Sequence, residues 1–263
     1  MERTYRFTIR AGRLALRALG IGVHVSGLEH LPATGPVLLA ANHVAYPDFL
    51  FVGKAVLERG RYTRFMCRHD IWHVPVVHRA MSRMRHVPVD RAAPAAAYLR
   101  ARSLLRDGEV VCAFPEAGIS YSYTIRPLMR GVAALARETG APIVPVAVWG
   151  SQRIWSVGRL VDGKEPRPDL TRGRRVDVRF CPPIRVGPDD DLVATTRQVG
   201  HELTEAVEAL QLMPEHRPAP GQHAPWYPAH LGGHAPDRVE ALDYDVVPRS
   251  AVQPTWGPLG DPA

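Results

Sequence analysis

Three short apolar runs constrain the fold of this chain more than any other feature. They are Val37–Ala41, Val110–Phe114 and Ile143–Val148, and no charged residue interrupts them. Continuous apolar runs of this length are typical of strands buried on both faces of a sheet. Helical patterns occur between them, at Pro94–Arg106 and Gly131–Glu138. The alternation predicts an α/β fold, a single domain with a largely parallel central sheet flanked by helices.

The first 20 residues predict an amphipathic helix with a basic stripe. Its arginines recur at steps of three and four residues: Arg3, Arg6, Arg10, Arg13 and Arg17. Apolar side chains cover much of the remaining surface, a pattern that suits a membrane interface. A helix packed on the domain with a solvated charged face would show the same amphipathic pattern. We interpret residues 1–20 as a membrane-interface helix, and the packed helix stays open as the alternative.

The last part of the chain loses the alternating pattern. Ten of the 25 prolines lie in residues 212–263, together with repeated glycines and no apolar period. Such a segment predicts irregular structure. We therefore expect one α/β domain at residues 21–212, followed by an irregular Pro/Gly-rich tail at residues 213–263.

The charge of the chain favours anionic partners. The formal net charge is +7, and the predicted domain between the N-terminal helix and the tail is basic. A basic surface attracts phosphate groups, coenzyme A, acidic lipid surfaces or nucleic acid. The sequence has no aromatic-basic motif of a known nucleic-acid-binding module, so we expect no nucleic-acid partner.

The cysteines and the N-terminus predict a compartment. Cys67, Cys112 and Cys181 lie far apart without metal-ligand spacing, which favours a reducing compartment and no metal site. Arginines interrupt what would have to be the apolar core of a signal peptide. No run of 18 apolar residues exists, so membrane contact is expected to be peripheral, at the cytoplasmic face.

A histidine and a carboxylate follow the first apolar run. His43 comes after Asn42 at the strand end, and Asp48 falls near the start of the next predicted helix. A turn of this length brings the carboxylate back to the imidazole, which then has one nitrogen held and the other free as a base. The spacing alone is weak, because a histidine satisfied at a strand end and a helix-capping aspartate would look the same.

Two further strand ends carry polar groups. Glu116 follows Val110–Phe114 in a loop of small residues, where backbone amides can approach a ligand. Arg91 follows a short predicted strand, and a guanidinium suits a phosphate bidentately. Arg130 precedes the helix at Gly131 and can add charge and amide groups to an anion site. Because parallel sheets place function at the carboxyl ends of their strands, we expect these groups to converge with His43.

Four ordered motifs resemble those of the glycerolipid acyltransferase family, whose best-known members are 1-acylglycerol-3-phosphate acyltransferases. They are Asn42-His43-x4-Asp48, the Arg91 segment, Phe114-Pro115-Glu116 and Ile143-Val144-Pro145-Val146. The resemblance covers about residues 20–212. It implies transfer of a fatty acyl group from a coenzyme A or acyl-carrier-protein thioester to a hydroxyl of a lysophospholipid.

The resemblance also implies roles for residues. His43 would be the general base and Asp48 its orienting partner, while Arg91 and Glu116 would lie in the acceptor's head-group site and Pro145 would shape the pocket. No metal or cofactor beyond the acyl-thioester co-substrate is implied. The substrate-binding residues expected on this basis are Asn42, Arg91, Glu116, Ala117, Gly118, Ser120, Arg126, Arg130 and Pro145.

This sequence departs from the family in the loop after Glu116. The family continues Gly-Thr-Arg-Ser, whereas this chain has Ala117, Gly118 and Ile119 and retains Ser120. The second motif also differs, at Arg85 and Pro88. The arginine missing at position 119 would remove one phosphate ligand. Either Arg126 or Arg130 replaces it, or the acceptor carries no phosphate monoester.

The sequence therefore predicts a membrane-associated acyltransferase whose domain spans residues 21–212. The expected acceptor is 1-acylglycerol-3-phosphate, which would give phosphatidate, with an anionic membrane surface as partner. Three alternatives stay open. They are a thioester or lipid hydrolase that uses the same His/Asp pair, acylation of a different polar lipid, and a non-catalytic binding protein at the membrane surface.

Overall fold

The computed structural model describes residues 2–90, 93–159 and 164–252, with backbone alone at residues 2 and 3. In these residues a seven-stranded sheet has the order β1-β7-β6-β2-β5-β3-β4. The strands are β1 (Gly22–Ser26), β2 (Val37–Ala41), β3 (Thr63–Arg68), β4 (Val87–Val89), β5 (Val110–Ala113), β6 (Ile143–Trp149) and β7 (Arg175–Phe180). The α-helices are α1 (Glu2–Ala18), α2 (Asp48–Glu58), α3 (Pro75–Arg83), α4 (Ala95–Arg106), α5 (Gly131–Thr139) and α6 (Leu192–Gln211).

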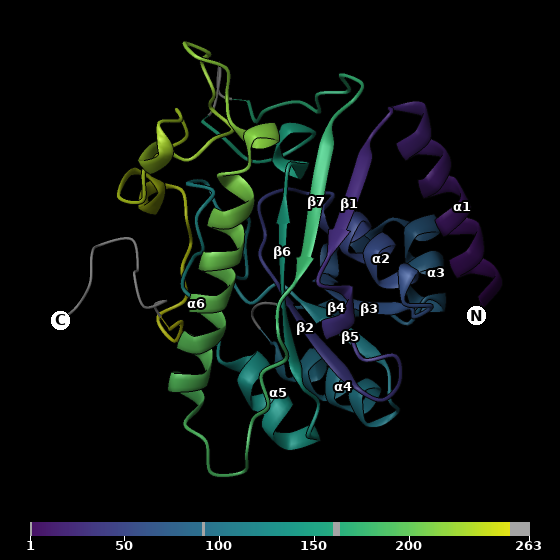
Figure 1. The fold of residues 1–263 in the computed structure, drawn as a ribbon. Helices are drawn as coiled ribbons and strands as arrows, with labels where there is room; N and C mark the ends of the chain where they lie inside the picture. Colours follow the sequence, from purple (N-terminus) through teal and green to yellow (C-terminus); the bar gives the residue numbers. More distant parts are fainter. Residues whose placement is uncertain (1, 91–92, 160–163, 253–263) are drawn as a thin grey trace.

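Five neighbouring strands of the sheet run in the same direction. β6, β2, β5, β3 and β4 pair in parallel, so their carboxyl ends meet at one edge. β7 pairs antiparallel with β6, and β1 pairs parallel with β7, so these two strands run the other way. The predicted α/β domain with a largely parallel sheet is confirmed, and Figure 1 shows the strands crossing the middle of the molecule.

The apolar strands are buried because both faces of the sheet are covered. In β2, Leu38 and Ala40 point into a cluster formed with α4, α5 and α6, while Leu39 and Ala41 point into a cluster formed with α2. This two-sided burial explains why the central strands read as continuous apolar runs. Figure 1 shows α6 and α1 at opposite sides of the sheet.

Helix α1 attaches to the body through a small part of its surface. The buried Tyr5 donates a hydrogen bond from its hydroxyl to the carbonyl of Thr63 at 2.7 Å. The opposite surface exposes Phe7 and Leu14, at 74% and 69% of their side-chain area, together with the arginines Arg6, Arg10, Arg13 and Arg17. Among the described residues, no helix is long and apolar enough to cross a membrane.

The described part of the tail has irregular structure with short 3-10 turns, and it packs on the domain. Tyr227 is buried in the cluster that also contains α6, and its hydroxyl donates to the carbonyl of Gln211 at 2.8 Å. Farther along, Leu128 and Val252 exchange two backbone hydrogen bonds at 2.7 and 2.8 Å. The tail, yellow-green to yellow in Figure 1, therefore reaches the loop between β5 and α5.

Candidate active site

The turn between β2 and α2 brings a histidine and an aspartate into contact. Nδ1 of His43 lies 2.9 Å from Oδ2 of Asp48. The same carboxylate oxygen accepts the backbone N–H groups of Val44 and Ala45, each at 2.8 Å. The hydroxyl of Ser151, which follows β6, donates to Oδ1 at 2.5 Å. Four donors thus orient a carboxylate that is completely buried.

The imidazole of His43 is held on one side and partly open on the other. Its ring stacks on Phe114 at the end of β5, with ring centroids 4.3 Å apart and an interplanar angle of 27°. Because Nδ1 donates its hydrogen to the carboxylate of Asp48, Nε2 carries the lone pair. The side chain keeps one fifth of its area exposed. This arrangement can remove a proton from a hydroxyl placed near Nε2.

Asn42 fastens the end of β2 to β6. Its amide Nδ2 donates to the carbonyl of Val148 at 3.1 Å, and its Oδ1 accepts the N–H of the same residue at 2.6 Å. The side chain is completely buried. In this structure Asn42 therefore fixes the backbone from which His43 projects.

Glu116 joins two loops through its carboxyl group. Oε1 accepts the backbone N–H of His43 at 2.7 Å, and Oε2 accepts the backbone N–H of Arg126 at 2.8 Å. Burial raises the pKa of Glu116 to about 8, against the lowering effects of these two hydrogen bonds and the Arg126 charge. Ser120 adds a second tie, because its N–H donates to the carbonyl of His43 at 2.9 Å. One carboxyl group thus fixes the backbones of His43 and Arg126 relative to each other.

The loop after Glu116 is shaped around the guanidinium of Arg126. Ala117 has φ 55°, in the left-handed region that favours glycine. A Cβ atom on Gly118 would lie 2.1 Å from Nη1 of Arg126, so a larger residue would displace the guanidinium. The hydroxyl of Ser120 donates to the carbonyl of Thr124 at 2.6 Å and closes the loop.

The remaining predicted residues lie in different surroundings. Arg130 precedes α5 and is exposed, and no contact connects it with His43 in the structure. Pro145 lies inside β6, buried and paired with Ala40 of β2. Arg91 lies outside the described residues. The structure thus gathers Asn42, His43, Asp48, Glu116, Ser120 and Arg126 at one edge of the sheet, and the roles of these residues in substrate binding stay predictions.

Sequence reasoning missed Ser151. It follows Gly150, which has φ 102° and whose missing side chain leaves space for the carbonyl of Arg175. The glycine turns the chain at the end of β6, so that the serine hydroxyl reaches Asp48. The available signal was its position after an apolar strand of the same sheet, the criterion that selected His43 and Glu116.

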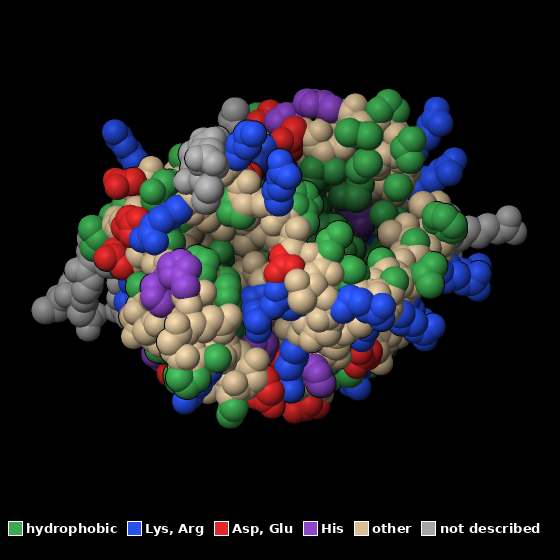
Figure 2. Space-filling model, turned by 90° about the horizontal axis from the view of Figure 1, so that it is seen from above, with side chains coloured by type: hydrophobic (Ala, Val, Ile, Leu, Met, Phe, Trp, Pro, Cys, Tyr) green, Lys and Arg blue, Asp and Glu red, His purple; other side chains and the backbone are tan. Residues whose placement is uncertain are grey.

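The face seen from above the view of Figure 1 is hollowed. Figure 2, which views the molecule from above, shows the hollow near the centre of this face, with hydrophobic side chains gathered on one side and Lys or Arg side chains along its rim. Exposed apolar side chains come from the start of α2, from the segment that leads into α3 and from the first turn of α3: Phe49, Leu50, Ile71, Val74 and Val76. This face therefore combines apolar surface with positive charge.

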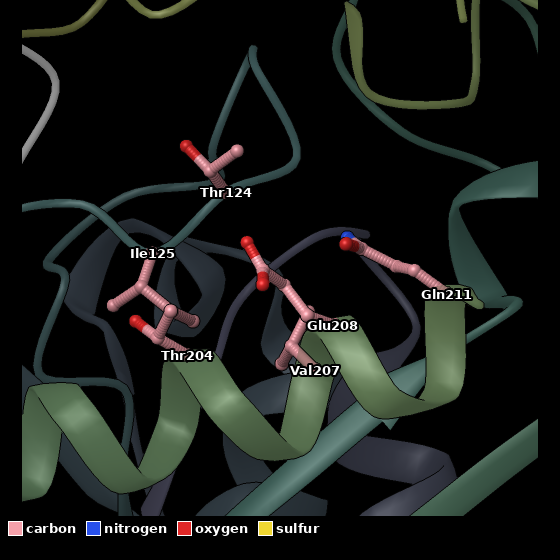
Figure 3. Close-up of a pocket in the computed structure, with 6 residues that line it drawn as sticks. All are labelled: Thr124, Ile125, Thr204, Val207, Glu208 and Gln211. Atoms are coloured by element: carbon pink, nitrogen blue, oxygen red, sulfur yellow. The ribbon is translucent and has the colours of Figure 1, made fainter. Parts of the chain in front are cut away.

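A second, shallow recess lies between α6 and the segment that leads to Arg126. The side chains of Figure 3 line it: Thr124, Ile125, Thr204, Val207, Glu208 and Gln211. The carboxamide of Gln211 donates to the carbonyl of Tyr123 at 2.9 Å and holds the segment against the helix. This recess contains none of the residues around His43, and its contacts support the loop that carries Arg126.

Comparisons with known proteins find similar chains. Residues 22–149 match the family model described as Acyltransferase. The chain is 30% identical over 138 residues to the chloroplast 1-acyl-sn-glycerol-3-phosphate acyltransferase BAT2 of Brassica napus, covering 51% of this chain and 39% of that protein. It is 29% identical over 147 residues to the 1-acyl-sn-glycerol-3-phosphate acyltransferase of Bacillus subtilis, covering 56% of this chain and 71% of that protein.

A solved structure shares the fold. The crystal structure of PlsC from Thermotoga maritima, a 1-acyl-sn-glycerophosphate (LPA) acyltransferase, superimposes with a TM-score of 0.62 over 79% of this chain and 80% of that chain, at 19% sequence identity. The chain spans less than half of the length of the plant relative. The residues that match the family model, 22–149, contain strands β1 to β6 and the His43 turn.

Proposed function

We propose that this protein transfers a fatty acyl group from a thioester of coenzyme A or acyl-carrier protein to a lysophospholipid hydroxyl, because residues 22–149 match the family model described as Acyltransferase. The proposed acceptor is 1-acylglycerol-3-phosphate, which the names of the B. napus and B. subtilis relatives specify, and the product is phosphatidate. The observation that carries the proposal is the contact of 2.9 Å between His43 and the buried, four-fold hydrogen-bonded Asp48.

In this proposal Nε2 of His43 removes the proton from the acceptor hydroxyl as its oxygen attacks the thioester carbonyl carbon. A carbon–oxygen bond forms, the carbon–sulfur bond breaks, and the proton passes from His43 to the leaving sulfur. Asp48 keeps the imidazole in the required tautomer and stabilises its positive charge. The thioester is already activated, so holding both substrates in line accounts for much of the rate.

The proposal places the reaction at the cytoplasmic face of an anionic membrane. The exposed side of α1 pairs arginines with Phe7 and Leu14. Arginines at a membrane surface bind lipid phosphates, while apolar side chains enter the acyl boundary. A peripheral position would bring the hollowed face close to the two acyl chains that the substrates carry.

The test is acyl transfer by the purified full chain on anionic vesicles. Lysophosphatidate and other lysolipids are offered with acyl-coenzyme A or acyl-carrier protein, and mass spectrometry identifies the products. We expect phosphatidate from lysophosphatidate. His43→Ala is expected to lower kcat/KM by about 10²- to 10⁴-fold, because that is the usual contribution of a general base.

The control is His78→Ala, since His78 is exposed on α3 and has no part in the proposed reaction. Release of free fatty acid without any diacyl lipid would show that the protein is a hydrolase and would overturn the proposed acyl transfer. Acyl transfer that persists in His43→Ala at the wild-type rate would remove His43 from the mechanism.

A further inference from the structure

A residue of the C-terminal tail lies against the guanidinium of Arg126. Oδ2 of Asp245 lies 3.4 Å from Nε, and both side chains are almost completely buried. The carbonyl of Val246 accepts a hydrogen bond from Nη2 at 3.1 Å. The third nitrogen, Nη1, donates to the carbonyl of Ile119 at 3.4 Å. The tail thus supplies an anionic group and a neutral acceptor to a cation that lies on the loop after β5.

The backbone of Arg126 is held relative to the backbone of His43. Glu116 accepts the backbone N–H groups of both His43 and Arg126. Gly118 leaves the space in which the guanidinium lies. Arg126 and the base His43 therefore lie on loops that are tied together through Glu116.

The carboxylate of Asp245 balances the charge of Arg126, but the pair leaves hydrogen-bonding atoms of both side chains without a partner. Within the described residues, the buried Oδ1 of Asp245 and the buried Nε of Arg126 have no hydrogen-bond partner. A carboxylate buried in this way is costly, and burial raises the pKa of Asp245 to about 6, against the lowering effects of the Arg126 charge and of a backbone hydrogen bond from Tyr121. A phosphate monoester has three terminal oxygens and a larger charge, so it fits a guanidinium better than a single misaligned carboxylate does.

We propose that Arg126 binds the phosphate monoester of the acceptor and that Asp245 occupies this anion site when the acceptor is absent. The inference rests on the proposed function, since it assigns the phosphate to the acceptor of that reaction. Asp245 is then an internal competitor, and residues 244–252 leave Arg126 when the acceptor binds.

The contacts of this part of the tail are few enough for such a displacement. Tyr244 stacks on Tyr121 with ring centroids 5.1 Å apart, and Val252 pairs with Leu128 through two backbone hydrogen bonds. Val246 is 85% exposed and Tyr244 is 38% exposed. Segments with few buried contacts open at low free-energy cost.

Kinetics of the full chain test the competition. Asp245→Asn removes the competing charge, and we expect it to lower the KM for lysophosphatidate by about threefold to tenfold, because the acceptor no longer pays for displacing the tail. Arg126→Gln is expected to raise the same KM. The matched control is Asp243→Asn, which replaces a nearby exposed carboxylate and should leave the KM for lysophosphatidate unchanged.

Acyl-coenzyme A, one of the possible acyl donors, also contains phosphate groups. Measuring the KM for the donor shows whether Arg126 binds the phosphate of the acceptor or a phosphate of the donor. We expect the donor KM to be the same in the wild type and in Asp245→Asn. An unchanged acceptor KM in Asp245→Asn would overturn the inference, and so would a change confined to the donor.

A binding measurement tests the tail without acyl transfer. Hydrogen exchange of the full chain is followed with glycerol 3-phosphate and, as the control, glycerol. We expect glycerol 3-phosphate alone to speed exchange of the Val252 amide, which is bonded to the carbonyl of Leu128 at 2.8 Å, and Arg126→Gln to abolish this effect. Unchanged exchange overturns the inference. If no variant acylates any lysolipid, the proposed function fails, and the exchange result still decides whether the tail competes with a phosphate.

Discussion

Ser151 connects the His43 turn to the rest of the sheet. Three of the four donors to Asp48 come from residues 43–45, within the same turn, and these hold Oδ2. Oδ1 depends on Ser151, which follows a different strand. A carboxylate held at one oxygen can still swing about it, so the serine hydroxyl fixes the plane in which the carboxylate meets the imidazole.

Replacing Ser151 tests this positioning role. Ser151→Ala is expected to lower kcat about tenfold, because a hydrogen bond to a charged group contributes about 1.5–3 kcal/mol. Ser151→Thr keeps the hydroxyl and should restore kcat. The matched control is Ser156→Ala, which removes a buried hydroxyl bonded to the carbonyl of Val44 and leaves Asp48 untouched. A similar loss of kcat in both alanine variants would reduce Ser151 to a general structural role.

At the level of elements, the sequence was sufficient to predict which strand ends carry the polar residues of the candidate site. β2 and β5 are covered on both faces, so they read as unbroken apolar runs, and the polar residues after them mark the carboxyl edge. The partners of Glu116 were not predictable, because its oxygens bind backbone amides at His43 and Arg126, 73 and 10 residues away. Backbone amides leave no signal in residue types.

Variants on the exposed face of α1 test the two interpretations that amphipathicity left open, a membrane-interface helix and a helix packed on the domain. The double variant Phe7→Ser/Leu14→Ser is expected to weaken binding to anionic vesicles by at least about tenfold, because each buried apolar side chain contributes about 1.5–3 kcal/mol. Vesicle sedimentation measures this binding. Leu99→Ser is the control, since Leu99 has 52% of its side-chain area exposed on α4. If the double variant binds vesicles as tightly as the Leu99→Ser control, α1 serves only to pack on the domain.

At the level of the whole molecule, two features arise from contacts between distant segments, and residue patterns do not reveal them. β7 pairs antiparallel with β6, and β1 pairs parallel with β7, so these two strands run opposite to the other five. The tail reads as irregular from its prolines and glycines, yet Asp245 reaches Arg126 across 119 positions. Both features depend on which surfaces meet after the central sheet has formed.

The same folded molecule contains buried groups whose pKa values move in opposite directions. Burial, with the nearby Arg64, lowers the pKa of His86 to about 4, whereas burial raises the pKa of Glu116 to about 8. The raised pKa of Glu116 gives stability that is complete below about pH 4.5 and lost as the pH rises through about 8. The lowered pKa of His86 gives stability that is complete above about pH 6.5 and lost as the pH falls through about 4.

The acid side of this profile can be assigned to His86. Its Nδ1 accepts the N–H of Phe65 at 3.0 Å, so the folded state needs the neutral ring, while the unfolded chain takes up a proton below about pH 6.5. We expect the free energy of unfolding in urea to fall by up to about 3 kcal/mol between pH 7 and pH 4 from this group. His86→Ala, although less stable at pH 7, should lose this pH dependence, whereas His78→Ala, at an exposed site, should keep it. An acid slope that is equal in all three proteins would assign the pH dependence to other groups.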